Sequence, residues 1–190
     1  MRRFITYAMK IIYMKPKVLS TETIYQGKVF DVSLARISEG EIEYEREIVS
    51  HNGSAVIVPV FSDKTVALVK QYRHAAEKYL WEIPAGSLEK GENPEAGARR
   101  ELEEEIGVSA GEMQLLTEFY VSPGFLSEKM FVFVASDLTE TAQNLEADEI
   151  IEIERFTFNQ AFEMIQSNEI EDAKTIAGLI LAGAKFGFNL

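Results

Sequence analysis

A short segment crowded with glutamate constrains this chain more than any other part of its sequence. Asn93 and Pro94 suit an N-cap and a first helical position, and Gly107 stands where glycine commonly ends a helix. These signals predict a helix from Asn93 to Ile106. Leu102 and Ile106 share one face of this helix and can anchor it in a hydrophobic core.

Three carboxylates lie on another face of the predicted helix. At about 100° per residue, Glu101, Glu104 and Glu105 come together, and like charges at this spacing repel each other. A divalent cation would remove the repulsion because it binds hard oxygen ligands. Arg100 could neutralise one carboxylate and fix its orientation. The alternative is an acidic helix face that is simply solvated.

The residues around the helix favour the metal-binding alternative. Gly86 is followed after five residues by Glu92, and after seven more by the segment that ends in Gly107 and Val108. From Gly86 to Val108 this spacing resembles the Nudix hydrolase signature at every defined position. The resemblance implies metal-assisted hydrolysis of a nucleoside diphosphate linkage. It also implies that Gly86 lies in a sharp turn and that Glu92 supports the loop or reaches a metal through water.

The resemblance assigns roles to individual residues of the segment. It makes Glu101 and Glu105 the main metal ligands, and the backbone carbonyl of Ala85 a further ligand. Glu104 is a bridging or supporting group that takes part in catalysis together with Arg100. The chain has no cysteine and only two histidines, so its metal ligands must be mainly oxygen atoms. Such ligands favour Mg²⁺, Mn²⁺ or Ca²⁺, and the resemblance implies Mg²⁺, with Mn²⁺ as a substitute.

Two flanking motifs narrow the range of expected substrates. The Pro-Ala-Gly sequence at 84–86 and the Ser-Pro-Gly sequence at 122–124 resemble marks of the ADP-ribose pyrophosphatase branch of the family. They imply hydrolysis of ADP-ribose to AMP and ribose 5-phosphate, with Pro123 and Gly124 beside the substrate. The alternative for the second motif is an ordinary turn between two strands.

Other functions stay open at this point, because the signature reports a diphosphate and a metal but not the group that the diphosphate carries. The alternative substrates are a nucleotide sugar such as GDP-mannose, or NADH. The alternative from another class is a catalytically silent, cation-binding regulatory module. This last alternative is less favoured because all the ligand positions are filled.

The general base is expected outside the helix. In this branch of the family, a loop after the signature carries the glutamate that accepts a proton from water. The register here favours Glu149, which immediately precedes an apolar pair, with Glu146 second and Asp148 third.

Further side chains are candidates for substrate binding. Arg73 ends a predicted strand and could hold a phosphate or the terminal ribose through its planar donor fork. Arg46 is a second candidate for the same work, and an ordinary surface charge is the alternative for both. Glu82, just before the Pro-Ala-Gly sequence, is also assigned to substrate binding.

The remaining conspicuous residues have structural interpretations. His51 and His74 are interpreted as structural rather than catalytic. Trp81 is expected in the core or in an interface, with stacking on adenine as the alternative.

The overall composition limits the partners. The chain has 190 residues and a formal net charge of −12, which argues against a general nucleic-acid binder. It lacks a run of about 18 apolar residues, so we expect no membrane partner. Residues 1–17 loosely resemble a signal peptide, but Lys10 interrupts the apolar run and no cleavage site follows. A cytoplasmic protein is expected, and Met9 or Met14 could be the true start.

The order of elements predicts an α/β fold. We expect a Nudix-type α/β/α sandwich with a mixed sheet at residues 53–190, and a small antiparallel β-sheet within residues 1–52. The expected strands are 18–25, 28–37, 41–49, 55–61, 65–72, 79–83, 115–121, 129–135 and 150–157, and the other expected helices are 159–167 and 172–186. The small sheet is marginal alone. Because related pyrophosphatases use such a segment to complete the site between subunits, a homodimer is expected.

Overall fold

The computed structural model describes residues 15–145 and 149–188. The chain forms two compact units that divide between Ser50 and His51, which is close to the expected boundary at residue 53. The N-terminal unit is a sheet with the strand order β1-β2-β3. Its strands are β1 (Lys17–Gln26), β2 (Phe30–Glu39) and β3 (Ile42–His51). Gly40, with a φ of 63°, lies in the tight turn between β2 and β3.

The second unit contains two sheets. The larger one has the order β7-β4-β9-β8 and is mixed, because β4 and β9 are parallel while the other pairs are antiparallel. Its strands are β4 (Ser54–Pro59), β7 (Ala85–Ser87), β8 (Val108–Tyr120) and β9 (Lys129–Glu140). The smaller sheet is antiparallel, with the order β10-β5-β6. Its strands are β5 (Thr65–Arg73), β6 (Lys78–Glu82) and β10 (Ile151–Thr157).

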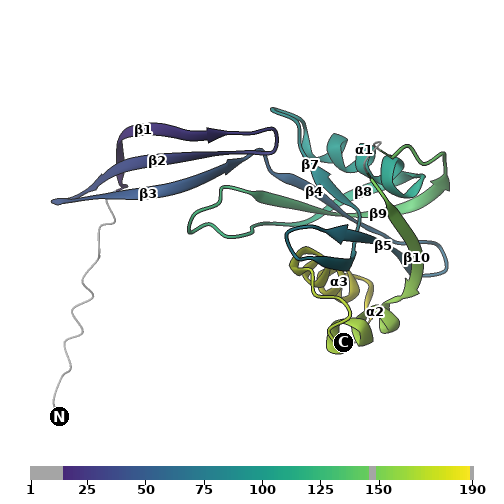
Figure 1. The fold of residues 1–190 in the computed structure, drawn as a ribbon. Helices are drawn as coiled ribbons and strands as arrows, with labels where there is room; N and C mark the ends of the chain where they lie inside the picture. Colours follow the sequence, from purple (N-terminus) through teal and green to yellow (C-terminus); the bar gives the residue numbers. More distant parts are fainter. Residues whose placement is uncertain (1–14, 146–148, 189–190) are drawn as a thin grey trace, which may run out of the picture. The chain divides into compact units, whose positions relative to one another are not determined.

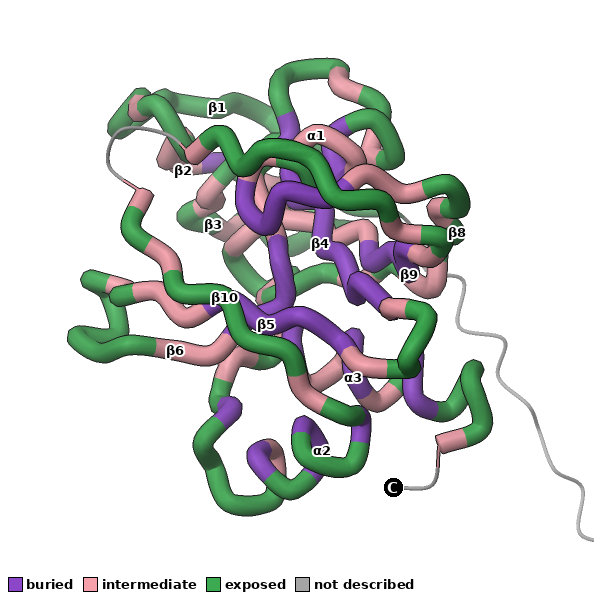
Figure 2. Tube along the Cα trace, turned by 90° about the vertical axis from the view of Figure 1, so that its right-hand side faces the viewer, coloured by how far each residue is buried: buried purple, intermediate pink, exposed green. Residues whose placement is uncertain are grey.

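Helices lie on both sides of these strands (Figure 1). They are α1 (Pro94–Ile106), α2 (Phe158–Gln166) and α3 (Ala173–Phe186). Strand β4 is buried along its whole length (Figure 2), because its alternate residues belong to two different cores. Ile57 belongs to one core with Leu102 of α1, while Val58 belongs to the other with Phe158 of α2 and Leu179 of α3. The expected α/β/α sandwich is therefore confirmed, with its strands divided between two sheets.

Helix α1 forms where its terminal signals predict it. The side chain of Asn93 accepts the backbone N–H groups of Glu95 at 2.9 Å and Ala96 at 3.2 Å. Gly107 ends the helix in the left-handed region, with a φ of 64°. The caps fix both ends of the acidic segment, so the carboxylates between them have a defined register.

Strands β7 and β8 differ from the expectation. β7 is a three-residue strand that the pattern of residues did not indicate. β8 begins at Val108, seven residues before the predicted start at Leu115. Its first half contains Gly111, where a Cβ atom would lie 2.3 Å from a carboxylate oxygen of Asp137. A side chain at this position would displace the Asp137 carboxylate of β9, so glycine suits the close approach of that side chain.

No helix in the described part of the chain is long and apolar enough to cross a membrane.

Candidate active site

Gly86 lets strand β7 approach the acidic helix closely. A Cβ atom at this position would lie 2.0 Å from a carboxylate oxygen of Glu101. The backbone N–H of the preceding residue, Ala85, donates to Glu105 at 3.1 Å. Gly86 lies in a strand rather than in the sharp turn that was expected. The glycine is needed because the carboxylate occupies the space of a side chain.

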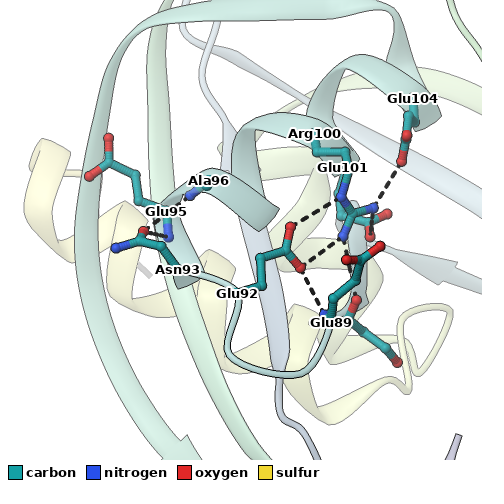
Figure 3. Close-up of polar contacts among 9 residues, drawn as sticks. Glu89, Glu92, Asn93, Glu95, Ala96, Arg100, Glu101 and Glu104 are labelled. Carbon is teal, nitrogen blue, oxygen red and sulfur yellow. Dashed lines mark hydrogen bonds and ion pairs between the residues drawn. The ribbon is translucent and has the colours of Figure 1, made fainter.

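Arg100 gathers three carboxylates around its guanidinium (Figure 3). It donates to Glu101 at 2.6 Å, to Glu104 at 3.0 Å and to Glu92 at 3.2 and 3.3 Å. Glu92 also accepts the backbone N–H of Glu89 at 2.8 Å, which closes the loop before α1. Burial opposes the charge of Arg100, but these carboxylates raise its pKa above the ordinary value. Arg100 therefore stays charged, and Glu92 supports the loop.

Glu101 and Glu105 are buried acidic groups, with 8% and 4% of their surface exposed. Burial raises the pKa of Glu105 to about 8, and the charges of Glu101 and Glu149 add to this effect. Burial likewise raises the pKa of Glu101, although Arg100 opposes it. The protein has therefore placed two carboxylates where ionisation is costly unless further positive charge arrives.

The segment after β9 is attached to the C-terminal end of α1. The backbone N–H of Thr141 donates to the carbonyl of Gly107 at 2.7 Å, and that of Asn144 donates to the carbonyl of Glu104 at 3.0 Å. The side-chain amide of Gln143 donates to the carbonyl of Glu105 at 2.6 Å. These bonds hold residues 141–144 against the C-terminal end of α1.

Glu149 comes within electrostatic reach of the acidic helix, because its charge contributes to the raised pKa values of both Glu101 and Glu105. The other candidates for the base, Glu146 and Asp148, lie outside the described residues.

Arg73 is at the end of β5 and is held by Glu82. Its Nε and Nη2 atoms donate to the two carboxylate oxygens of Glu82, each at 2.7 Å. This pair raises the pKa of Arg73, and the nearby charge of Glu105 raises it further. Arg73 therefore lies within electrostatic reach of Glu105, while 39% of its side chain stays exposed.

Glu82, assigned to substrate binding from the sequence, lies in a buried network of ion pairs. Glu82 is only 1% exposed. Its carboxylate accepts hydrogen bonds from Arg73 and from Lys174. A substrate would have to break these buried pairs to reach it. Glu82 is placed instead to orient the guanidinium of Arg73.

A hollow of about 500 Å³ opens beside Arg73. Its other lining residues are Gln71, Tyr72, His74, Ala75 and Ile150. The rings of Tyr72 and His74 meet edge to face, with centroids 5.1 Å apart. Since Ile150 directly follows Glu149, the hollow brings together the candidate clamp and the end of the loop that carries the candidate base.

The Ser-Pro-Gly sequence forms the turn between β8 and β9. The backbone N–H groups of Phe125 and Leu126 donate to the carbonyl of Ser122 at 3.2 and 3.0 Å. Glu128, at the end of this connection, accepts the hydroxyl of Ser54 at 2.7 Å. Pro123 and Gly124 thus occupy a turn whose far end is attached to β4.

His51 has a structural place, as interpreted from the sequence. Its Nδ1 atom accepts the backbone N–H of Gly53 at 3.0 Å, and its Nε2 atom lies 3.4 Å from the hydroxyl of Ser87. The ring therefore connects the start of β4 with the end of β7.

Trp81 packs against the core, and Arg46 belongs to the other compact unit. Trp81 meets Phe156 edge to face at 5.3 Å and packs against the core beside α2 and α3. It lines a hollow other than the one beside Arg73. Arg46 belongs to the N-terminal unit, where its guanidinium lies 4.3 Å from the ring of Tyr44.

The donor set suits a hard divalent cation. Glu101, Glu104 and Glu105 offer only oxygen atoms, and burial raises the pKa values of Glu101 and Glu105. Within residues 15–145 and 149–188, no three acidic or histidine side chains are already gathered tightly enough to hold a metal ion. Arg100 donates hydrogen bonds to Glu101 and Glu104, and the backbone N–H of Ala85 donates to Glu105. A cation would bind here by replacing part of these contacts.

The contact between Lys174 and Glu82 could not be found from the sequence pattern, whereas the residues beside Arg73 had a local signal. Lys174 reaches Glu82 from α3, across 92 positions of sequence, and no local motif marks it. Tyr72 and His74 flank Arg73 and share its hollow. Their position beside a candidate clamp at the end of a strand was the available signal.

Comparisons with known proteins agree with this geometry. The NUDIX domain model matches residues 51–179. An ADP-ribose pyrophosphatase of Bacillus subtilis is 40% identical over 166 residues, covering 85% of this chain and 89% of that protein. A GDP-mannose pyrophosphatase of Salmonella arizonae is 34% identical, with 87% and 91% covered. A Bacillus methanolicus protein described as a methanol dehydrogenase activator is 37% identical, with 84% and 88% covered.

The fold is also found among solved structures. The crystal structure of an ADP compounds hydrolase superposes with a TM-score of 0.82 at 24% identity, and the match covers 92% of this chain and 96% of that one. The domain match and the similarity to the Bacillus subtilis enzyme agree with the acidic helix α1 and the close approach of Gly86 to it. This chain therefore belongs to the NUDIX family and is a Nudix hydrolase.

Proposed function

We propose that this protein hydrolyses the diphosphate linkage of ADP-ribose to AMP and ribose 5-phosphate in a Mg²⁺-dependent reaction. The observation that carries the proposal is the position of Arg73 and Glu149 beside the buried carboxylates of α1. The ADP-ribose pyrophosphatase of Bacillus subtilis, 40% identical over most of both chains, supports the choice of substrate.

The residues divide the chemistry between them. Glu101 and Glu105 would hold Mg²⁺ together with the carbonyl of Ala85, and Glu104 would bridge or support them. Bound Mg²⁺, or Mn²⁺ in its place, supplies positive charge that screens the diphosphate and makes water easier to deprotonate. Glu149 accepts the proton of the attacking water. Arg73, held by Glu82, donates to a phosphate or to the terminal ribose.

Arg100 has a supporting part in this proposal. In the structure it pairs with Glu101 and Glu104, which are two of the proposed metal-site carboxylates. Its two bonds to Glu92 would let Arg100 hold the loop before α1 if Glu101 and Glu104 held a cation. Its charge also offsets the crowding of carboxylates between turnovers.

A second candidate function is hydrolysis of another nucleoside diphosphate derivative. The Salmonella arizonae GDP-mannose pyrophosphatase is 34% identical over 177 residues, so a nucleotide sugar is a specific alternative. NADH is a third compound with the same linkage. A regulatory role without turnover is the alternative from another class, and one relative, from Bacillus methanolicus, is described as an activator.

A substrate panel tests the proposal. ADP-ribose, GDP-mannose, NADH and 8-oxo-dGTP are incubated with the protein in EDTA, in Mg²⁺ and in Mn²⁺, and the products are separated by chromatography. We expect AMP from ADP-ribose at the highest kcat/KM, and only with a metal. Preferential cleavage of GDP-mannose would replace the proposed substrate, and no turnover of any compound would favour the regulatory role.

Two glutamates of the same helix give a matched test of the metal site. Glu105→Gln removes a buried carboxylate, whereas Glu103→Gln changes its exposed neighbour. We expect Glu105→Gln to lower kcat by about a hundredfold or more, with the circular dichroism spectrum unchanged. Glu103→Gln should keep the wild-type rate. Equal rates for the wild type and Glu105→Gln would remove Glu105 from the proposed site.

A further inference from the structure

We infer that Lys174, at the start of α3, is a positioning residue of the active site that acts through Glu82 on Arg73. The inference rests on the proposed function, because Arg73 is the substrate-binding group in that proposal. It adds a part of the molecule, the first turn of α3, that the family signature does not contain.

Lys174 is fixed by the cap of its own helix. Its side chain is 10% exposed, and its ammonium lies 3.0 Å from a carboxylate oxygen of Asp172. Asp172 is the N-cap of α3 and accepts both the backbone N–H of Thr175 at 2.9 Å and its hydroxyl at 2.6 Å. The ion pair with Asp172 therefore helps to fix the position of the ammonium that contacts Glu82.

Lys174 also determines how Glu82 can hold Arg73. A buried carboxylate needs compensating charge and hydrogen bonds on its oxygens. One oxygen of Glu82 accepts from Lys174 and from the Nη2 atom of Arg73, and the other accepts from Nε of Arg73. With Lys174 in place, the plane of the carboxylate is fixed and Arg73 binds it through two nitrogens. The Nη1 atom is not used in this pair.

The same turn of α3 holds the main chain beside Glu82. The backbone N–H of Ile83 donates to the hydroxyl of Thr175 at 2.9 Å, and Thr175 is fully buried. The segment from Glu82 to Ala85 is thus attached to α3 at its beginning and to Glu105 at its end. Glu82 cannot shift along the chain direction without breaking a buried bond.

Lys174 acts indirectly, because it does not line the hollow beside Arg73. A substrate in that hollow would meet the guanidinium but not the ammonium. Without Lys174, Arg73 is the remaining cation that pairs with the buried carboxylate of Glu82 in the described contacts. The carboxylate can then rotate, and it no longer aligns the guanidinium. The expected consequence is weaker substrate binding with little change in the chemical step.

The first test compares Lys174→Met with Lys78→Met. The second lysine forms an exposed pair with Glu171, close in sequence to α3, and so is a matched control. Binding of ADP-ribose in EDTA is measured by calorimetry, and KM and kcat are measured with Mg²⁺. We expect Lys174→Met to weaken binding and raise KM by roughly fivefold to tenfold, with kcat within about twofold. Lys78→Met should match the wild type, and wild-type binding by Lys174→Met would overturn the inference.

A double-mutant cycle tests whether the effect passes through Arg73. In an Arg73→Gln background, Lys174→Met should cause almost no further loss of ADP-ribose binding. The same fold loss in both backgrounds would show that Lys174 acts independently of Arg73, and the inference would fail.

A second double variant, in which both buried charges are replaced by neutral side chains, distinguishes lost substrate binding from lost folding. Breaking a buried ion pair from one side destabilises proteins strongly, so the double variant Glu82→Gln with Lys174→Met is also measured. It removes the charges of Glu82 and Lys174 together and leaves the partly exposed Arg73 without its carboxylate. We expect it to fold with weakened binding, because the amide offers Arg73 only one acceptor. A folded double variant with wild-type affinity would contradict the inference. Failure of the wild type to cleave ADP-ribose would instead defeat the proposed function, and the variants are then compared with the compound it does cleave.

Discussion

Glu105 is the carboxylate of the site whose ionisation is most opposed by its surroundings. Burial and the charges of Glu101 and Glu149 raise its pKa to about 8. A carboxyl group with a raised pKa adds stability below its unfolded value, near 4.5, and loses that contribution as the pH rises through the folded value. We therefore expect the free energy of unfolding in EDTA to fall between about pH 5 and pH 8, on the order of a few kcal/mol.

Urea denaturation at several pH values checks this prediction. The pKa of Glu101 is also raised and acts in the same direction. Glu82 has a lowered pKa, so its contribution is lost only in acid, outside this window. Glu105→Gln should flatten the fall, and Mg²⁺ should counteract it at pH 8 in the wild type. A Glu105→Gln protein with the pH dependence of the wild type would contradict the assignment.

Residue roles could be predicted from sequence where they depend on local spacing. The caps of α1 fix the register of Glu101, Glu104 and Glu105, so their common face follows from helical geometry alone. The role of Glu149 as general base stays a prediction, which rests on the family resemblance and on its place before an apolar pair. The roles of Glu82 and Lys174 depend on a contact across 92 positions, and no pattern within either segment reports it.

At the scale of elements, the start of α3 makes a contribution to the free energy of unfolding that can be measured. Thr175 is fully buried and its hydroxyl joins the backbone N–H of Ile83 to Asp172. Thr175→Val keeps the shape but leaves that N–H without its acceptor, which we expect to cost about 1–3 kcal/mol of unfolding free energy. Thermal or urea denaturation measures the loss.

Thr175→Ser is the control for this prediction, because it keeps the hydroxyl and removes only a methyl group. It should lose less stability than Thr175→Val. If the serine variant is the less stable of the two, packing of the methyl group, rather than the hydrogen bond, stabilises the start of α3.

The elements themselves could be predicted only where side-chain patterns agree with the packing. Helix α1 and strand β4 have caps or apolar runs that match their burial. The first half of β8 was missed because Gly111 and its neighbours do not resemble a strand, and only the approach of β9 explains them. The division of the strands into two sheets depends on pairing between distant segments, which composition does not report.

At the scale of the whole molecule, the N-terminal unit has too little core for a sheet of three strands. Every residue of β1 is exposed, and Val18 and Ile24 keep 62% and 59% of their surface exposed. A sheet of this size needs a further surface to be stable. Apolar side chains on such a sheet favour association with another protein surface, and a second copy of this chain is the partner expected from the family.

We therefore predict that the protein is a homodimer held by its N-terminal sheet. Sedimentation equilibrium should give about twice the chain mass of 21.4 kDa. Ile24→Lys places a charge in the exposed apolar set and should shift the protein toward monomer, whereas Leu181→Lys, at an exposed position of α3, should not. If the dimer completes the site, Ile24→Lys should also lower kcat/KM for ADP-ribose in proportion to the monomer fraction. A wild type that sediments as a strict monomer would contradict the prediction and leave the exposed sheet to a different partner.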